Sequence, residues 1–393
     1  MKISSPKITQ ENEQVFYRVA VESARGSETL WYSLDEPFGN LVATSCDAPL
    51  VGLLIPAMAA GEDIHVDGVI SERLFYNFSG PYQKLLQLVI PSLKPVRISA
   101  DTVCGSRACR PPGVATGFSG GIDSYCALAD HYGSNVSDSF KITHLLYNNV
   151  GSHGKNGERL FRKRFEHLAP TAERLGLPFV KVDSNLGKFY GRGLGFSKTD
   201  TPRNASAALL LQGGIGRCMY ASSYSYPHVF VGPSKYMSFT ESISLPLLST
   251  ETLDIFSVGG QYTRVEKTLR VAELPESYGS LDVCAKALHD AADTNCSTCQ
   301  KCLRTLATLE IAGLLERYSG SFDLAAYRRH RTMFFASMPG SPNPFHKEII
   351  EFCRQRRFPY PAASRILNAL RIHKLASLCE RLLRKVTQPP EKP

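Results

Sequence analysis

Hydrophobic and polar residues alternate along the first part of the chain in the pattern that half-buried β-strands require. Between these stretches, apolar residues recur at the spacing of helices. The expected strands are 15–24, 29–36, 63–68 and 95–101, and the expected helices are 49–60 and 71–90. This region predicts a small α+β module, which ends in a Pro- and Gly-rich linker at 103–113.

From residue 114 onward, strands and helices are predicted to alternate. This rhythm is typical of a parallel sheet covered by helices on both faces, with right-handed crossovers. The expected strands are 114–118, 142–150, 178–183 and 228–234, and the expected helices are 122–132, 157–176 and 204–221. The fold class is therefore α/β. Ligands of such sheets bind at the carboxyl ends of the strands.

A chain of 393 residues is long enough for two or three domains. We expect an N-terminal α+β module over 1–110, an α/β domain over 111–318 and a basic helical region over 319–393. A cysteine-rich segment, 284–302, falls inside the second of these.

The sequence Ser119-Gly120-Gly121-Ile122-Asp123-Ser124 stands where a strand is predicted to give way to a helix. Backbone N–H groups at a helix N-terminus lack partners, and glycines let a ligand approach them closely. Such a concavity suits phosphate, and an aspartate beside it suits phosphate-bound Mg²⁺. The loop lacks the GK[ST] ending of a Walker A motif. A helix cap with a glycine turn is the structural alternative.

Four cysteines, Cys284, Cys296, Cys299 and Cys302, have the spacing C-x11-C-x2-C-x2-C. Four thiolates with two C-x2-C steps suit a closed, tetrahedral structural Zn²⁺ site. The same residues also suit an iron–sulfur cluster, or could be redox-active or unrelated thiols. Cys284 is the least certain ligand, because its spacing is long.

The SGGxDS loop resembles the PP-loop of the N-type ATP pyrophosphatases, an adenine nucleotide alpha hydrolase-like fold. Together with the cysteines and with Thr201-Pro202-Arg203-Asn204, it resembles the 7-cyano-7-deazaguanine synthase family, the nitrile synthases of the queuosine pathway. The likeness covers about 114–315, so the N-terminal module and the C-terminal extension are additional. It implies ATP-dependent adenylation of a carboxylate with release of pyrophosphate, then attack by ammonia or an amine to give an amide, or a nitrile after a second activation.

On this basis Ser119, Gly120, Gly121 and Ser124 are expected to cradle pyrophosphate, with Asp123 at Mg²⁺. Tyr147 falls in the segment 146–149, where relatives bind adenine. Arg203 is a candidate contact for phosphate or carboxylate, or else a surface arginine. Lys235 is a candidate cation at the sheet edge, and the loop 189–198 is a candidate lid. Arg264 and Lys267 could reach phosphates, or could form a solvated helix face.

The net charge of +9 is uneven, because residues 341–393 carry 11 Lys and Arg against 4 Asp and Glu. The rest of the chain is nearly neutral, which gives no strong signal for nucleic-acid binding. The amphipathic stretch 364–386 and the N-terminal module are candidate surfaces for a protein partner. With no signal-peptide pattern at the start, we expect a cytoplasmic protein, which could form a homodimer.

The leading hypothesis is an AMP-forming C–N ligase that uses ATP, Mg²⁺ and Zn²⁺ on a small-molecule or peptide carboxylate. A second is a nucleobase- or tRNA-modifying PP-loop enzyme, which a catalytic cysteine pair outside the zinc set would favour; Cys104 and Cys109 are the candidates for such a pair. A third is an ATP-binding subunit without its own catalysis, which works within a larger assembly.

Overall fold

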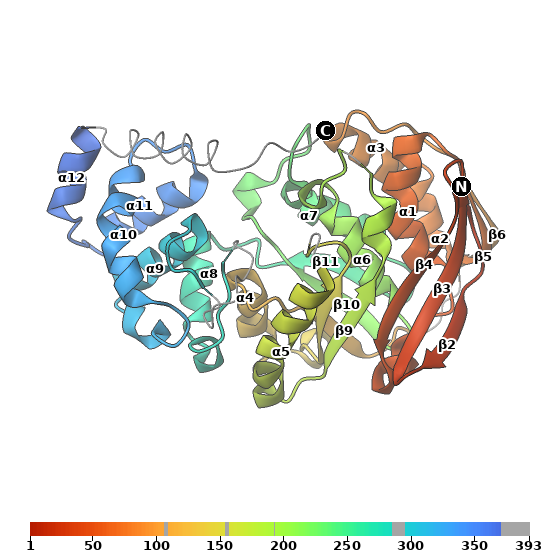
Figure 1. The fold of residues 1–393 in the computed structure, drawn as a ribbon, viewed down its shortest axis with the longest axis horizontal. Coiled ribbons are helices and arrows are strands. Elements are labelled where there is room, and N and C mark those ends of the chain that lie inside the picture. The colour runs from red at the N-terminus through yellow and green to blue at the C-terminus, as the bar shows by residue number, and fades with distance from the viewer. Residues whose placement is uncertain (106–108, 154–156, 192, 285–294, 371–393) are drawn as a thin grey trace. The chain divides into compact units, whose positions relative to one another are not determined.

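A computed structural model describes residues 1–105, 109–153, 157–191, 193–284 and 295–370 of the chain (Figure 1). The described chain packs as two units. The first unit is Met1–Tyr262, and the second begins at Thr263. The division differs from the predicted boundaries at 110 and 318, because the N-terminal module belongs to the same unit as the parallel strands.

The first unit is built on one mixed sheet, whose strands run in the order β11-β10-β7-β8-β9-β4-β3-β1-β5-β6, with β2 paired to β3. The first five of these are mutually parallel. They are β7 (Gly113–Gly117), β8 (His144–Asn149), β9 (Phe179–Ser184), β10 (Ile215–Ala221) and β11 (Asp254–Val258). This bears out the α/β class. After β9 the chain returns to the far side of β7, so β7 and β10 flank the point where strand order reverses.

Helices lie on both faces of the parallel strands (Figure 1). They are α4 (Ile122–His131), α5 (Gly157–Leu175) and α6 (Asp200–Leu210), and a short α7 (Glu241–Ser244) follows. α4 and α5 connect β7, β8 and β9 in sequence, whereas α6 leads back across to β10. Right-handed crossovers running in opposite directions place their helices on opposite faces.

The N-terminal module extends this same sheet. Its β4 pairs antiparallel with β9 through Tyr32↔Ser184 and Ser33↔Asp183, and Asn185 binds the backbone of Trp31 and Thr29. The module comprises β1 (Lys2–Ile3), β2 (Lys7–Glu11), β3 (Gln14–Ser23), β4 (Gly26–Asp35), α1 (Asp47–Ala60), β5 (Ile64–Ser71), α2 (Glu72–Phe78), α3 (Pro81–Val89) and β6 (Ile98–Cys104).

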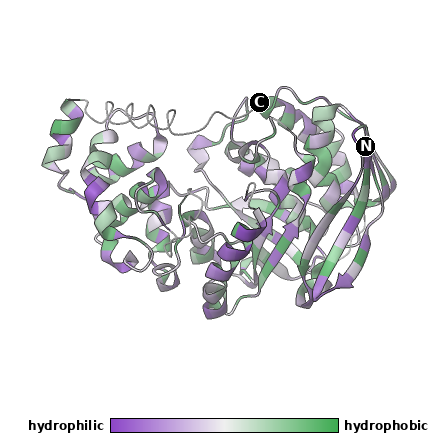
Figure 2. Ribbon diagram, in the orientation of Figure 1, coloured by the Kyte–Doolittle hydropathy of each residue, from purple (hydrophilic) through white to green (hydrophobic). Residues whose placement is uncertain are grey.

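The core of the first unit centres on α1, which is hydrophobic along most of its length (Figure 2). Residues 48–58 of this helix are all buried. Most of them belong to one apolar cluster with residues of α6 and with Val180 and Val182 of β9. Burial of this much apolar surface is the main force that joins the module to the parallel strands.

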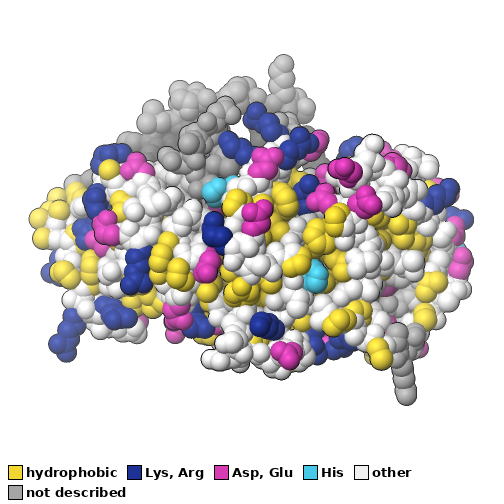
Figure 3. Space-filling view, turned by 90° about the horizontal axis from the view of Figure 1, so that it is seen from below, with side chains coloured by type: hydrophobic (Ala, Val, Ile, Leu, Met, Phe, Trp, Pro, Cys, Tyr) yellow, Lys and Arg dark blue, Asp and Glu magenta, His cyan; other side chains and the backbone are white. Residues whose placement is uncertain are grey.

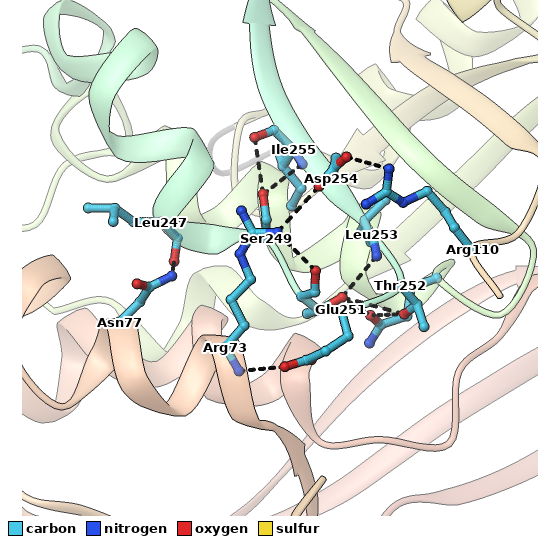
Figure 4. Close-up of polar contacts among 12 residues, drawn as sticks. Arg73, Asn77, Arg110, Leu247, Ser249, Glu251, Thr252, Leu253, Asp254 and Ile255 are labelled. Carbon is cyan, nitrogen blue, oxygen red and sulfur yellow. Dashed lines mark hydrogen bonds and ion pairs between the residues drawn. The ribbon is translucent and has the colours of Figure 1, made fainter. Parts of the chain in front are cut away.

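Polar contacts join α2 to the segment before β11 (Figure 4). Arg73 donates its backbone N–H to Glu251 at 2.7 Å, and its guanidinium lies 3.4 Å from Asp254. Asp254 also pairs with Arg110 at 2.6 Å, and Asn77 donates to the backbone of Leu247 at 3.0 Å. These contacts fix the edge strand β11 against the N-terminal module.

Three of the predicted elements are wrong. The expected helix 204–221 is a helix that ends at Leu210 and a strand, β10, because glycines 213, 214 and 216 break the helical pattern. The expected strand 228–234 contains no strand, and the fifth parallel strand is instead β11. The expected helix 71–90 is two helices, divided at Ser79 and Gly80.

The second unit is helical in its described part. It contains α8 (Arg264–Val271), α9 (Gln300–Ile311), α10 (Leu324–Ser337), α11 (Pro344–Gln355) and α12 (Ala362–Ala369). The predicted amphipathic stretch 364–386 lies outside the described residues from 371 onward. None of the described helices is both long and apolar enough to cross a membrane. On the face drawn in Figure 3, Lys and Arg side chains lie among Asp and Glu rather than forming one basic surface.

Candidate functional site

The loop between β7 and α4 has the backbone geometry that its glycines permit. Gly120 has a φ of 72°, which L-residues with a side chain rarely adopt. Gly121 is extended at the N-cap of α4 and has no side chain with which to cap the helix. Ser124 donates its hydroxyl hydrogen to the Gly121 carbonyl at 3.0 Å, which folds the first helical turn back onto the loop. The result is a turn of backbone at a helix N-terminus, which can accept an anion.

A cavity of about 330 Å³ opens beside this loop. It lies at the carboxyl ends of β8, β7 and β10, where the strand order reverses and where open α/β sheets bind ligands. Its volume falls at the lower end of the range of small-molecule pockets. Of the predicted site residues, Ser119, Asp123, Ser124 and Tyr147 line it.

One wall of the cavity comes from β8 and the residues after it. The Tyr147 ring stacks on Phe161 of α5, with centroids 5.1 Å apart, and its hydroxyl is 3.2 Å from His153 Nε2. Burial, together with the charge of Arg164, lowers the pKa of His153 to about 4. His153 is therefore a neutral hydrogen-bonding group at pH 7. Asn148 also lines this wall, and its buried Oδ1 has no hydrogen-bond partner among the described residues.

The opposite wall is formed by α6 and β10, through Asn204 and Tyr220. The Asn204 Nδ2 group donates to the Asp200 carbonyl at 3.0 Å and to the Tyr220 hydroxyl at 3.3 Å. Burial raises the pKa of the nearby Asp200 carboxyl to about 7. The sequence did not predict Tyr220 as a site residue, because the span 204–221 was expected to be one helix. The glycines at 213–216 are the signal that would have placed Tyr220 at a strand end.

Arg203 lies behind this wall and is 3% exposed. Its guanidinium stacks on Tyr190 at 3.4 Å and donates to the carbonyls of Val150 and Leu194. It thus holds Tyr190 and Leu194 of the loop 189–198, the predicted lid, and Phe196 of that loop lines the cavity. The alternative of a surface arginine is wrong, and these contacts are those of a positioning residue.

Lys235 is exposed in an irregular segment that follows β10. Among the described residues it does not line the cavity. Arg264 and Lys267 belong to α8 of the second unit, where Thr263 and Glu266 form a capping box. Lys267 is only 2% exposed, so it does not lie on a solvated helix face.

The four cysteines of the second unit come together, and their sulfur atoms all lie within 4.8 Å of one another. The Cys299 sulfur is 3.5 Å from that of Cys302 and 4.0 Å from that of Cys284. Four sulfurs around Zn²⁺, with Zn–S bonds of about 2.3 Å, would be about 3.8 Å apart. The partly buried cluster could therefore hold a metal such as zinc. The predicted segment 284–302 includes 285–294, which lie outside the described residues.

The turn between Cys296 and Cys299 is shaped for a ligand pair. Ser297 has a φ of 56° and is fully buried, and its Oγ accepts from the backbone N–H of Asp323 at 2.9 Å. The Cys299 N–H donates to the Cys296 sulfur at 3.3 Å. A hydrogen bond with Cys299, and burial, raise the pKa of Cys302. Four thiolates this close repel one another unless a cation binds among them.

Comparison of the chain with models of known protein families, with curated proteins and with solved structures gave no match. The loop, the cavity and the cysteine cluster are therefore the features from which a function can be inferred.

Proposed function

We propose that this protein binds ATP·Mg²⁺ at the Ser119–Ser124 loop, adenylates a substrate carboxylate and releases pyrophosphate. Ammonia or an amine then displaces AMP to give an amide, from which a second activation would give a nitrile. One observation carries the proposal: a glycine turn at the N-terminus of α4 lies beside a cavity at the switch point of a parallel sheet.

In the first step, a carboxylate oxygen of the substrate attacks the α-phosphorus of ATP, and the bond between the α-phosphorus and the bridging oxygen breaks. Pyrophosphate leaves with that electron pair. Negative charge develops on the phosphates, so catalysis depends mainly on positioning and charge neutralisation. The amides of Gly120 and Gly121, with the hydroxyls of Ser119 and Ser124, would bind the leaving pyrophosphate, and Asp123 would hold Mg²⁺.

The cavity offers a surface for the adenine ring of ATP and an environment for the nitrogen nucleophile of the second step. Tyr147, stacked on Phe161, offers an aromatic surface for the adenine ring. Among the described residues that line the cavity, Asp123 and Arg164 are the charged groups, and His153 is neutral at pH 7. A site with so few charges favours a neutral amine or ammonia as the nitrogen donor.

The zinc cluster would have a structural role. Four cysteine ligands leave no open coordination position on zinc, so the metal would hold the start of α9 rather than bind substrate.

The test is analysis of the nucleotide products when the full chain is incubated with ATP, Mg²⁺, ammonium and a panel of carboxylates. The proposal expects AMP and pyrophosphate, with a loss of about a hundredfold in Ser119→Ala and Asp123→Asn. Ser27→Ala and Asp138→Asn change exposed residues away from the loop and serve as matched controls. Formation of ADP and phosphate would refute the PP-loop chemistry. AMP formation that persists undiminished in both loop variants would show that the loop is not the site.

A further inference from the structure

The wall opposite Tyr147 contains hydrogen-bonding groups that are not satisfied within the described chain. The Nδ2 group of Asn204 must be the donor to Asp200, because a backbone carbonyl can only accept. This fixes the orientation of the Asn204 amide. Its contact with Tyr220 is then also a donation, from Asn204 Nδ2 to the phenolic oxygen.

The hydrogen atom of the Tyr220 hydroxyl is consequently left to point elsewhere. Among the described residues it has no acceptor, and the Tyr220 side chain lines the cavity. Burial and the nearby charges of Asp200 and Glu241 hold the pKa of this phenol well above its ordinary value. The hydroxyl is therefore protonated at neutral pH and is a donor.

Tyr220 lies on the strand next to the one that leads into the Ser119–Ser124 loop. β10 pairs in parallel with β7, and Met219 is in register with Thr116. Tyr220 is thus the next residue along β10, level with Gly117, at which β7 ends and the Ser119–Ser124 loop is about to begin. A group bound between the loop and α6 would lie within reach of the hydroxyl.

Asn148, on the wall that carries Tyr147, supplies a second, independent sign of a ligand in the cavity. It stands on β8, on the other flank of β7, and its carboxamide makes no hydrogen bond with a described residue. A buried polar atom without a partner is costly, and a native protein keeps one where a ligand or water completes it.

We propose that the Tyr220 hydroxyl, held in place by Asn204, donates a hydrogen bond to the acyl oxygen of the activated substrate. This inference rests on the proposed function and adds a catalytic residue to it. When nitrogen attacks the acyl carbon, the C=O electron pair moves to that oxygen, and the hydrogen bond from Tyr220 stabilises the charge. The oxygen then re-forms the double bond, AMP leaves with the C–O electron pair, and the nitrogen gives its proton to water. Tyr220 keeps its own proton throughout, and Asn204 is a positioning residue.

The role of Tyr220 can be tested without the natural substrate, by comparing the affinities of the chain for two nucleotides. The probes are AMP and 5′-O-(N-acetylsulfamoyl)adenosine, a stable mimic of an acyl adenylate, measured by calorimetry on the full chain. Tyr220→Phe removes only the hydroxyl, and we expect it to weaken binding of the mimic about three- to tenfold while AMP binds unchanged. Asn204→Ala should have a smaller effect of the same kind. Tyr236→Phe, at an exposed tyrosine outside the cavity, is the matched control.

Equal affinity of the native chain and Tyr220→Phe for the mimic would overturn the inference. So would a loss that is the same for AMP and the mimic, because that would be a general disturbance of the site. If the native chain binds neither nucleotide, the proposed function fails, which is a separate result. With a carboxylate that supports turnover, Tyr220→Phe should slow amide formation about a hundredfold and leave substrate-dependent exchange of pyrophosphate into ATP intact.

Discussion

The carboxyl group of Asp200 is buried in the folded chain, where its ionised form is energetically unfavourable. It begins α6 and accepts a hydrogen bond from the Thr201 N–H at 3.0 Å, but burial dominates and raises its pKa from 3.8 to about 7. The folded chain therefore holds this proton more tightly than the unfolded chain does. Between pH 4 and pH 7 the contribution of Asp200 to the free energy of unfolding must fall as the pH rises, because the folded state still holds a proton that the unfolded state has already lost.

The expected magnitude follows from the size of the shift. Each pKa unit corresponds to about 1.4 kcal/mol, so the carboxylate destabilises the first unit by up to about 4 kcal/mol above pH 7. Asp200→Asn has nearly the same shape, keeps an oxygen to accept from Thr201 and cannot ionise. We expect the variant to match the native chain near pH 4 and to be more stable than it at pH 8.

The single tryptophan makes this difference measurable. Trp31 lies in β4 of the first unit, so its fluorescence during urea unfolding reports on that unit. Other groups also titrate in this range: the lowered pKa values of His131, His144 and His153 make stability rise with pH. These contributions are common to both proteins and cancel in the comparison. Parallel pH curves for the native chain and Asp200→Asn would refute the reasoning, and the exposed Asp138→Asn should give such parallel curves.

Three further predictions concern other parts of the chain. Gly120→Ala puts a side chain at a φ of 72° and should cost roughly 1–2 kcal/mol in the same fluorescence assay, with weaker ATP binding by calorimetry. Elemental analysis should find about one zinc per native chain and none in Cys302→Ser, whereas Cys353→Ser, a buried cysteine outside the cluster, should retain the metal. Arg203→Lys loses the planar stack on Tyr190 and the paired donors. It should cost roughly 2 kcal/mol and speed tryptic cleavage within the loop 189–198; unchanged cleavage would contradict the positioning role.

Local sequence patterns predicted most elements of the first unit. The alternation over 15–24 and 29–36 matches β3 and β4, and the charged amphipathic run 157–176 matches α5. The pattern failed where a glycine cluster divides an apolar stretch, since the residues 204–221 contain both helix and strand. Buried strands and buried helices are both made of apolar residues. In the sequence, only interrupting residues such as glycine show where one ends and the other begins.

Some residues of the candidate site could likewise be predicted from the sequence, and others could not. Ser119, Asp123, Ser124 and Tyr147 could be predicted, because the glycine loop is a local signal and the strand before Tyr147 is clear. The strand-end position of Tyr220 had a signal in the glycines at 213–216, but the roles of Asn148 and Tyr220 could not be predicted, since they come from hydrogen bonds that are missing among the described residues. The union of the module with the parallel strands also has no local signal, because it depends on the pairing of β4 with β9, some 150 residues apart.

The N-terminal module, joined to the parallel strands in this way, also supports one wall of the cavity. α6, which carries Arg203 and Asn204, packs against α1 of the N-terminal module, and the Tyr32 hydroxyl donates to Ser206 Oγ at 3.1 Å. Tyr190, on which Arg203 stacks, donates its hydroxyl to the Gly52 carbonyl at 2.8 Å. The cavity wall that faces the Ser119–Ser124 loop is therefore supported by the N-terminal module, and not by the parallel strands alone. Under the proposed function, this wall, supported by a module that the resemblance to the deazaguanine nitrile synthases does not cover, is where we expect a different acyl substrate to be selected.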